Sequence, residues 1–313
     1  MIPMLRTILA VSLTLMLSHV AAAQVTVVTS IKPLQLIAHA VTDGVSEPAV
    51  LIPANQSYHH FVMKPSTVRA ISTANLLVWV GPELETWLAD TLAERDTETV
   101  EVLALPGLKV HHAGYDDHDD VEILIPQQGD HAGHQHKHGH SIDPHIWLDT
   151  DNALLIAQAM VSKLSALDPV NAGRYQDNLA SFSQQLISLR DRLQADLMPL
   201  QNTDYAVYHN AFQYFERQFN LSHQLVFVES EELQPGVRHM LAVRRAIEER
   251  PLTCVLEDVT AQASTVNTLL GNQPVNRIQA DTTGQALTSG PQAYVNLMEN
   301  LANAFKRCQV SSN

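Results

Sequence analysis

The chain has 313 residues, with 19 Lys and Arg against 33 Asp and Glu, a formal net charge of −14 and a sequence pI near 5.5. This acidity disfavours nucleic acid as a partner, because phosphate backbones are bound through clusters of Lys and Arg. Beyond the first 23 residues there is no apolar stretch long enough to cross a bilayer, and the remaining length suits two ordinary α/β lobes.

Residues 1–23 predict a cleaved secretory signal peptide. Arg6 precedes an apolar run, and the alanines at 21–23 offer an A-x-A cleavage site before Gln24. The alternative is a retained membrane anchor, which the short and Ser/Thr-interrupted apolar run disfavours. We therefore expect the chain to be exported.

The region after the signal peptide alternates between strand-like and helix-like segments. We predict strands at residues 25–29, 48–52, 76–80 and 99–105, and helices at 34–41, 66–74 and 83–93. Such alternation is typical of an α/β lobe with a largely parallel sheet, and we assign residues 24–167 to this N-terminal lobe.

A His- and Asp-rich loop, residues 111–142, interrupts this lobe. It has four Gly and almost no apolar periodicity, so we expect disorder. Imidazole and carboxylate are ligands for borderline metals such as Zn²⁺. We therefore expect auxiliary metal sites at the loop histidines His111, His112, His118, His131, His134, His136, His138 and His140. The alternative is a solvated low-complexity loop with chance enrichment in His.

The spacing within the loop limits what it binds. His134, His136, His138 and His140 alternate along the chain, so in an extended chain successive rings are almost 7 Å apart, too far to chelate one ion. Binding must then order the segment at a cost in entropy, which predicts weak, multiple sites. A loop that is dispensable for transport stays open as an alternative.

A long helix is predicted after the loop. Asp149 or Asp151 caps a preceding helix that runs to about Ala166, and Asp168-Pro169 then starts the next one. Apolar residues recur at 4-3-4-3 spacing along one helical face, at Tyr175, Leu179, Phe182, Leu186, Leu189, Leu193 and Leu197. The helix, assigned to residues 168–199, would be roughly 45 Å long and would join two lobes.

The last part of the chain, residues 200–313, predicts a second α/β lobe. Its strands are expected at 205–208, 224–228, 254–256 and 275–279, and its helices at 209–219, 237–249, 261–270 and 291–307. Two cysteines, Cys254 and Cys308, suggest one disulfide in an exported chain, tying the last helix to the strand at 254. The competing interpretation is a pair of thiol metal ligands.

Three histidines lie near strand ends or helix starts: His59, His145 and His209, and the acids Glu257 and Asp258 follow another strand. In open α/β sheets, ligands bind outside the carboxyl ends of the strands. Two lobes that face each other would bring these side chains into one cleft, so we predict an ordered metal site between the lobes. Each ligating ring needs an acceptor for its other nitrogen, and Asp143 and Asp149 are candidates for His145.

Four segments carry a family resemblance. Residues 59–66 (HHFVMKPS) look like an H-x-x-x-x-[RK]-P-S motif, and residues 143–149 (DPHIWLD) resemble D-P-H-x-W. Residues 205–215 (YAVYHNAFQYF) and 234–236 (QPG) resemble two further landmarks of the same family, the cluster A-I (cluster 9) metal-binding proteins. The His-rich loop and the cysteine pair resemble the zinc-specific, ZnuA-like branch. The match covers nearly the whole mature chain.

The resemblance implies a periplasmic solute-binding protein, not an enzyme, that delivers Zn²⁺ to an inner-membrane ABC permease. It implies two lobes joined by one long helix, and we expect a monomer. Carried over by motif, the primary ligands are His59, His145 and His209. The fourth position is an acid in manganese or iron binders, and commonly water or a flexible carboxylate in zinc binders. Glu257 and Asp258 both remain candidates for it.

His60 departs from the family pattern, because an Asp is common after the first histidine. We favour an outward neighbour over an alternative ligand. Three imidazoles and one oxygen suit tetrahedral Zn²⁺, whereas Mn²⁺ or Fe²⁺ in the same fold is the alternative ion and Mn²⁺ prefers more oxygen ligands. Two other classes stay open: a secreted zinc hydrolase, although no HExxH or GxSxG is present, and a periplasmic metal buffer or chaperone.

Overall fold

The computed structural model describes residues 24–112 and 142–310, apart from residues 54, 55, 57, 59, 60, 94, 96, 229–234 and 251. The predicted signal peptide, His59, His60 and the loop histidines from His118 to His140 lie outside the described residues. No helix among the described residues combines the length and the apolarity that a bilayer span requires.

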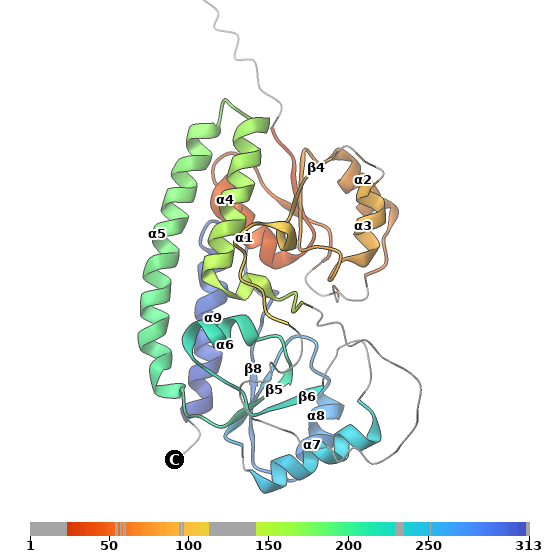
Figure 1. Ribbon diagram of the computed structural model, residues 1–313, viewed down its shortest axis with the longest axis vertical. Helices are drawn as coiled ribbons and strands as arrows, with labels where there is room; N and C mark the ends of the chain where they lie inside the picture. The colour runs from red at the N-terminus through yellow and green to blue at the C-terminus, as the bar shows by residue number, and fades with distance from the viewer. Residues whose placement is uncertain are drawn as a thin grey trace, which may run out of the picture.

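The described strands form two four-stranded parallel sheets (Figure 1). The N-terminal sheet has the order β2-β1-β3-β4 and the C-terminal sheet the order β6-β5-β7-β8. The strands are β1 Val27–Thr29, β2 Ala49–Val50, β3 Leu76–Trp79, β4 Glu98–Glu101, β5 Tyr205–His209, β6 Leu225–Val228, β7 Cys254–Glu257 and β8 Asn276–Gln279. The predicted α/β fold with parallel sheets is confirmed.

Helices cover both sheets. They are α1 Lys32–Thr42, α2 Pro65–Thr73, α3 Thr86–Ala93, α4 Thr150–Leu167, α5 Ala172–Leu197, α6 Gln213–Phe219, α7 Val237–Glu249, α8 Ala263–Leu270 and α9 Ala293–Val310, with 3₁₀ turns η1 Val102–Ala104, η2 Ile146–Leu148 and η3 Met198–Leu200. In Figure 1, α1, α4, α5 and α9 run side by side along one flank of the molecule, and α7 and α8 lie against the outer part of the C-terminal sheet. This helical layer therefore spans both sheets.

The inner strands are buried on both faces, as their sequences predict. β1 reads VVT and β3 reads LLVW, and every residue of these strands is buried. The edge strand β8 reads NRIQ and buries only Ile278. The strand predicted at 99–105 is shorter than expected, because the chain turns into η1 after Glu101 and the backbone N–H of Leu103 bonds the Val80 carbonyl at 2.8 Å.

α5 is the long helix that the apolar spacing predicts. Its 26 residues correspond to a length of roughly 39 Å. Six of the seven predicted face residues are buried, and Leu179 is partly buried. The predicted start at Asp168 is wrong, because Asp168 is the C-cap of α4. Its carboxylate accepts hydrogen bonds from Asn171 at 2.7 Å and from the Tyr175 hydroxyl at 3.0 Å.

One hydrophobic core joins both sheets through the helical layer. It includes Val28 of the N-terminal sheet, Leu256 of the C-terminal sheet and Leu189 of α5. The Phe305 ring of α9 lies 5.5 Å from Tyr205, ring centre to ring centre. A smaller cluster lies under α7 and α8. Because the two halves share a core, their relative positions are set by packing as well as by the linking helix.

The predicted disulfide between Cys254 and Cys308 is present. It joins the first residue of β7 to α9, and the two Cα atoms are 5.3 Å apart. Both residues are buried. The sulfurs are therefore committed to the cross-link, and the thiol-ligand alternative does not apply to this structure.

Glu85 is a fully buried carboxyl group at the carboxyl ends of β1 and β3. It accepts a hydrogen bond from the Ser30 hydroxyl and others from the backbone N–H groups of Val80 at 3.3 Å and Gly81 at 3.0 Å. Burial raises the pKa of Glu85 to about 7, and the hydrogen bonds only partly oppose this. The folded protein therefore binds this proton more tightly than the unfolded chain does.

Glu85 should consequently make stability fall with rising pH. The stabilising contribution is fully present below the ordinary carboxyl pKa of about 4.5 and is lost as the pH rises through about 7, a change of at most roughly 3 kcal/mol. In urea titrations with EDTA, we expect the unfolding free energy of the wild type to fall relative to that of Glu85→Gln as the pH rises from about 5 to about 8. A difference that does not change with pH would contradict the assignment.

Candidate metal centre

His209 and Asp258 are brought together by the register of the C-terminal sheet. β5 and β7 pair in parallel, with Tyr205 opposite Cys254 and Val207 opposite Leu256. The same offset places His209, the last residue of β5, opposite Asp258, which follows β7. Nδ1 of His209 and Oδ2 of Asp258 are 2.5 Å apart, and both side chains are buried.

Asp258 is held in its ionised form. Burial by itself would raise the pKa of Asp258, but the attraction of His209 and hydrogen bonds from His209 and Thr260 outweigh burial, so the pKa is lowered. Its second oxygen, Oδ1, accepts from the Thr260 backbone N–H at 2.7 Å and from the Thr260 hydroxyl at 2.5 Å. A carboxylate at Nδ1 fixes the ring so that Nε2 is the nitrogen presented to a metal.

His145 has the same arrangement. Oδ1 of Asp143 lies 2.7 Å from Nδ1 of His145 and also accepts from the His145 backbone N–H at 3.0 Å. Of the two acceptors predicted for this ring, the structure therefore selects Asp143. Asp149 instead caps α4, accepting from the backbone N–H groups of Asp151 and Asn152.

The two imidazoles lie against each other between the sheets. Their ring centres are 5.3 Å apart, and His145 and His209 are 4% and 5% exposed. The Tyr58 hydroxyl lies 3.1 Å from Nε2 of His145, and the Trp147 ring meets the His145 ring edge-on at 5.3 Å. His145 is thus flanked by two aromatic side chains, and each ring of the pair is held at Nδ1 by a buried carboxylate.

The remaining predicted site residues are placed differently. Both carboxylate oxygens of Glu257 bond to Arg277, one of them to Nη2 at 2.8 Å. Among the described residues, no cluster of three or more His, Cys, Asp or Glu side chains is arranged to hold a metal ion. His59 and His60 lie outside those residues, while Tyr58, their sequence neighbour, contacts His145. The described part of the site is therefore the His145–His209 pair with its two carboxylates.

The two ends of the His-rich loop meet beside this pair. His112 forms an isolated antiparallel bridge with Ile142, and the Asp143 backbone N–H bonds the His111 carbonyl at 2.8 Å. We call these paired end residues, 111, 112 and 142, the neck of the loop. Of the eight predicted loop ligands, His111 and His112 lie in the neck. The neck runs directly into Asp143, the residue that orients His145.

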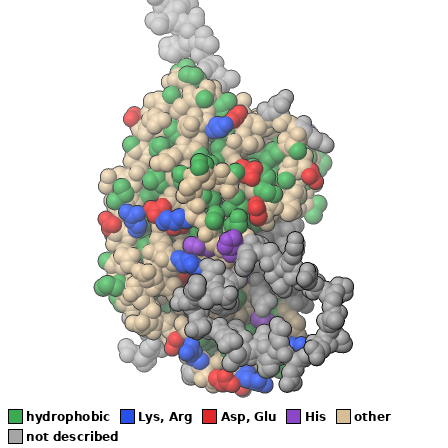
Figure 2. Space-filling view, in the orientation of Figure 1, with side chains coloured by type: hydrophobic (Ala, Val, Ile, Leu, Met, Phe, Trp, Pro, Cys, Tyr) green, Lys and Arg blue, Asp and Glu red, His purple; other side chains and the backbone are tan. Residues whose placement is uncertain are grey.

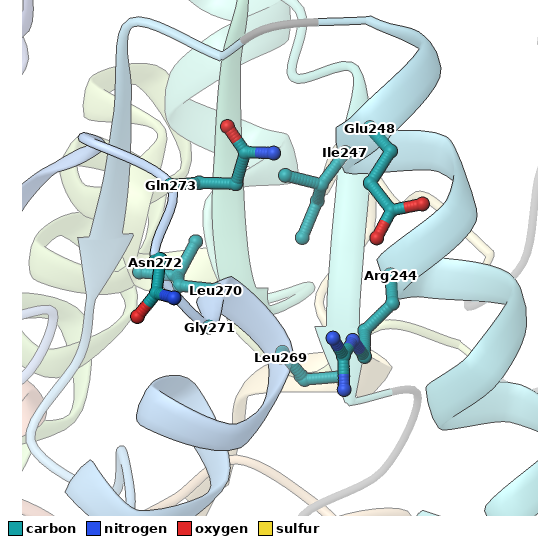
Figure 3. A pocket seen from close by; sticks show the side chains of 8 residues that line it. All are labelled: Arg244, Ile247, Glu248, Leu269, Leu270, Gly271, Asn272 and Gln273. Atoms are coloured by element: carbon teal, nitrogen blue, oxygen red, sulfur yellow. The ribbon is translucent and has the colours of Figure 1, made fainter.

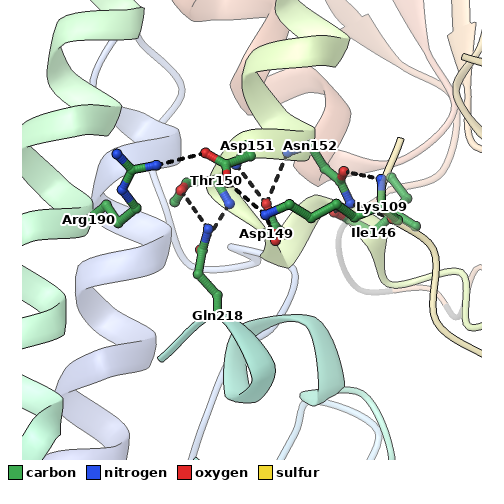
Figure 4. Close-up of polar contacts among 8 residues, drawn as sticks. All are labelled: Lys109, Ile146, Asp149, Thr150, Asp151, Asn152, Arg190 and Gln218. Carbon is green, nitrogen blue, oxygen red and sulfur yellow. Dashed lines mark hydrogen bonds and ion pairs between the residues drawn. The ribbon is translucent and has the colours of Figure 1, made fainter. Parts of the chain in front are cut away.

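Polar contacts hold the chain just before the neck to the start of α4 (Figure 4). Lys109 exchanges two backbone hydrogen bonds of 2.9 Å with the Asn152 side chain. Its ammonium group contacts Asp149 at 3.1 Å and Asp151 at 2.7 Å. These contacts fix the neck relative to η2 and α4.

The surface shows two further features. Histidine side chains are visible near the middle of the face drawn in Figure 2. A groove of about 270 Å³ lies between α7 and α8, with Arg244, Glu248 and Gln273 among its lining residues (Figure 3). The groove is lined by neither His nor Cys, so its chemistry differs from that of the histidine pair.

Sequence reasoning did not identify two aromatic residues of this region, Tyr58 and Tyr214. Tyr58 directly precedes the His59 motif, and Tyr214 lies within the segment that follows His209, so position next to a motif was the available signal. Tyrosine is not a usual zinc ligand, and both residues make their contacts with segments distant in sequence.

Comparisons with known proteins identify the family of the chain. The family model described as "Zinc-uptake complex component A periplasmic" (ZnuA) matches residues 27–308. A high-affinity zinc uptake system protein ZnuA from Yersinia pestis is 31% identical over 294 residues, covering 91% of this chain and 92% of that protein. The same-named protein from Brucella abortus (strain 2308) is 31% identical over 313 residues, covering 93% of each chain.

Solved structures share the fold. A crystal structure of ZnuA superimposes with a TM-score of 0.70 at 22% identity, covering 90% of this chain and 99% of that chain. A Zn(II)-bound variant of AdcAII from Streptococcus pneumoniae gives a TM-score of 0.70 at 20% identity, covering 90% and 98%. These structures show the fold, and the family match over residues 27–308 together with the relatives at 31% identity shows that the chain belongs to the ZnuA family of periplasmic zinc-uptake components.

Proposed function

We propose that this solute-binding protein captures Zn²⁺ between its two lobes with His59, His145 and His209 and delivers it to an inner-membrane ABC permease. The observation that carries the proposal is the pair of buried imidazoles whose Nδ1 atoms are each held by a carboxylate. Zinc-binding histidines characteristically have such a partner, because it orients the ring and raises its basicity.

The third ligand is assigned to His59 on its motif. Its sequence neighbour Tyr58 contacts His145, which supports the assignment. Three imidazoles and one oxygen form a tetrahedral site that suits Zn²⁺. Since Asp258 already binds His209 and Thr260, we assign it to orienting His209, and water is the simplest fourth ligand. Glu257 is paired with Arg277, so we do not assign it as a zinc ligand. We assign His60 as an outward neighbour of His59 rather than as a ligand.

The organisation of the chain follows from this proposal. Residues 1–23 direct export to the periplasm, lobes 24–167 and 200–313 supply the site, and the linking helix α5, Ala172–Leu197, joins them in a monomer. Loop 111–142 supplies weaker auxiliary zinc sites. Its neck next to Asp143 supports a role close to the primary site.

The test is calorimetric titration of Zn²⁺ into metal-stripped protein that lacks residues 113–141. The neck suggests this deletion, because His112 and Ile142 are bridge partners that a two-residue Asn-Gly hairpin can join. We expect one tight site to remain and the weaker sites to disappear. Loss of all tight binding would instead identify the loop as the binding element and the protein as a metal buffer.

A further inference from the structure

We propose that Tyr214 is a positioning residue for zinc binding, which fastens Asp143, and through it His145, to the C-terminal half of the molecule. The proposal rests on the proposed function, because it concerns the same histidine pair. It assigns a role to a residue that is not itself a metal ligand.

Tyr214 makes two hydrogen bonds from a fully buried position on α6. Its hydroxyl donates to the Asp143 carbonyl at 2.8 Å and accepts from the His111 backbone N–H at 3.0 Å. Burial raises the pKa of Tyr214, so the hydroxyl keeps its proton and remains a donor. One side chain therefore bonds both strands of the loop neck.

The position of Asp143 determines the position of the His145 ring. The Tyr214 hydroxyl bonds its carbonyl, the His111 carbonyl bonds its N–H, and its carboxylate binds both Nδ1 and the backbone N–H of His145. A shift of the backbone at residue 143 must then shift or rotate the imidazole. Zinc affinity responds to such shifts, because tetrahedral coordination requires defined positions for the ligand nitrogens.

The other flank of His145 is also held by the C-terminal half. The Trp147 indole N–H donates to the Thr282 carbonyl at 2.8 Å, and the Trp147 carbonyl accepts from the Tyr294 hydroxyl of α9 at 2.7 Å. Gln218 of α6 exchanges two hydrogen bonds with Thr150, at 3.1 and 2.9 Å.

His145 is therefore held in the same packed unit as His209, although it precedes the linking helix in sequence. Hydrogen bonds from α6, α9 and the segment after β8 hold both sides of the His145 segment, and β5 carries His209. The 5.3 Å ring separation is then a property of one packed unit rather than of the angle between lobes. Such preorganisation raises affinity, because less ordering remains to be done on binding.

The test compares Tyr214→Phe with a control, Tyr175→Phe, in the metal-stripped full chain. Both tyrosines are fully buried on helices, and each hydroxyl donates one hydrogen bond, that of Tyr175 to Asp168 at 3.0 Å. Tyr175→Phe therefore controls for the loss of a buried hydroxyl donor, whereas Tyr214→Phe also loses the bond accepted from His111. We expect Tyr214→Phe to weaken zinc binding by about tenfold in chelator competition, and Tyr175→Phe by less than twofold. Equal affinities in the two variants would overturn the proposal.

A second measurement reads positioning without zinc. In ¹H–¹⁵N spectra of metal-stripped protein, we expect the Nδ1–H of His145 to exchange with solvent faster in Tyr214→Phe, while that of His209 is unchanged. Unchanged exchange at His145 would overturn the proposal, even if the parent protein shows no tight zinc site and the proposed function fails. Tyr294→Phe, which releases Trp147 on the other flank, should act in the same direction if Tyr214→Phe does not fold.

Discussion

Replacing His209 by alanine is expected to weaken zinc binding by about two orders of magnitude while leaving the fold intact. A structural zinc site with four ligands is worth about 10–16 kcal/mol, so losing one ligand costs roughly 3 kcal/mol, or about two orders of magnitude in affinity. His145→Ala should behave alike, since both rings are built into the same pair. Calorimetric titration of the metal-stripped variants measures the effect directly.

A graded series strengthens this test. Asp258→Asn keeps the shape of the carboxylate but weakens its bond to Nδ1 of His209, so zinc affinity should fall by about 10- to 100-fold. His39→Ala is the matched control, because His39 is a buried histidine of α1 that contacts Glu47 rather than the pair. Full affinity in His209→Ala, or an equal loss in His39→Ala, would refute the assignment of the site.

Removing the disulfide should have the largest effect on stability. Cys254 and Cys308 are 54 residues apart, and closing a loop of this length contributes about 4 kcal/mol in the chain-entropy model. We expect Cys254→Ala combined with Cys308→Ala to lower the unfolding free energy by about this amount in urea titrations of zinc-free protein. Zinc affinity of the folded variant should be nearly unchanged, because neither sulfur contributes a ligand.

Reduction of the wild-type protein separates the cross-link from packing. If the covalent constraint is responsible, reduced wild type and the double variant should lose similar stability. A large loss in the variant alone would point to the cavities left by two buried side chains. A loss below about 1 kcal/mol in both would contradict the chain-entropy argument for this disulfide.

Much of the architecture was predictable because apolar residues recur at regular spacing along the buried face of a helix or strand. α7 spans Val237–Glu249 as predicted, and the buried face of α5 follows the apolar spacing. Helix boundaries were less predictable where two capping signals compete. Asp168 resembles a helix start in the sequence, yet it ends α4, because its backbone N–H bonds the Leu164 carbonyl and closes the last turn of that helix.

The α/β class, the cysteine pair and the histidines of the candidate site could be predicted before folding, because they depend on residue type and local pattern. The partners of these histidines depend on how distant segments of the chain pack together. Strand register selects Asp258 rather than Glu257 for His209, and backbone geometry selects Asp143 rather than Asp149 for His145. The hydrogen bonds of Tyr214 join segments about 70 to 100 residues apart in sequence, and no local pattern encodes a contact over that separation.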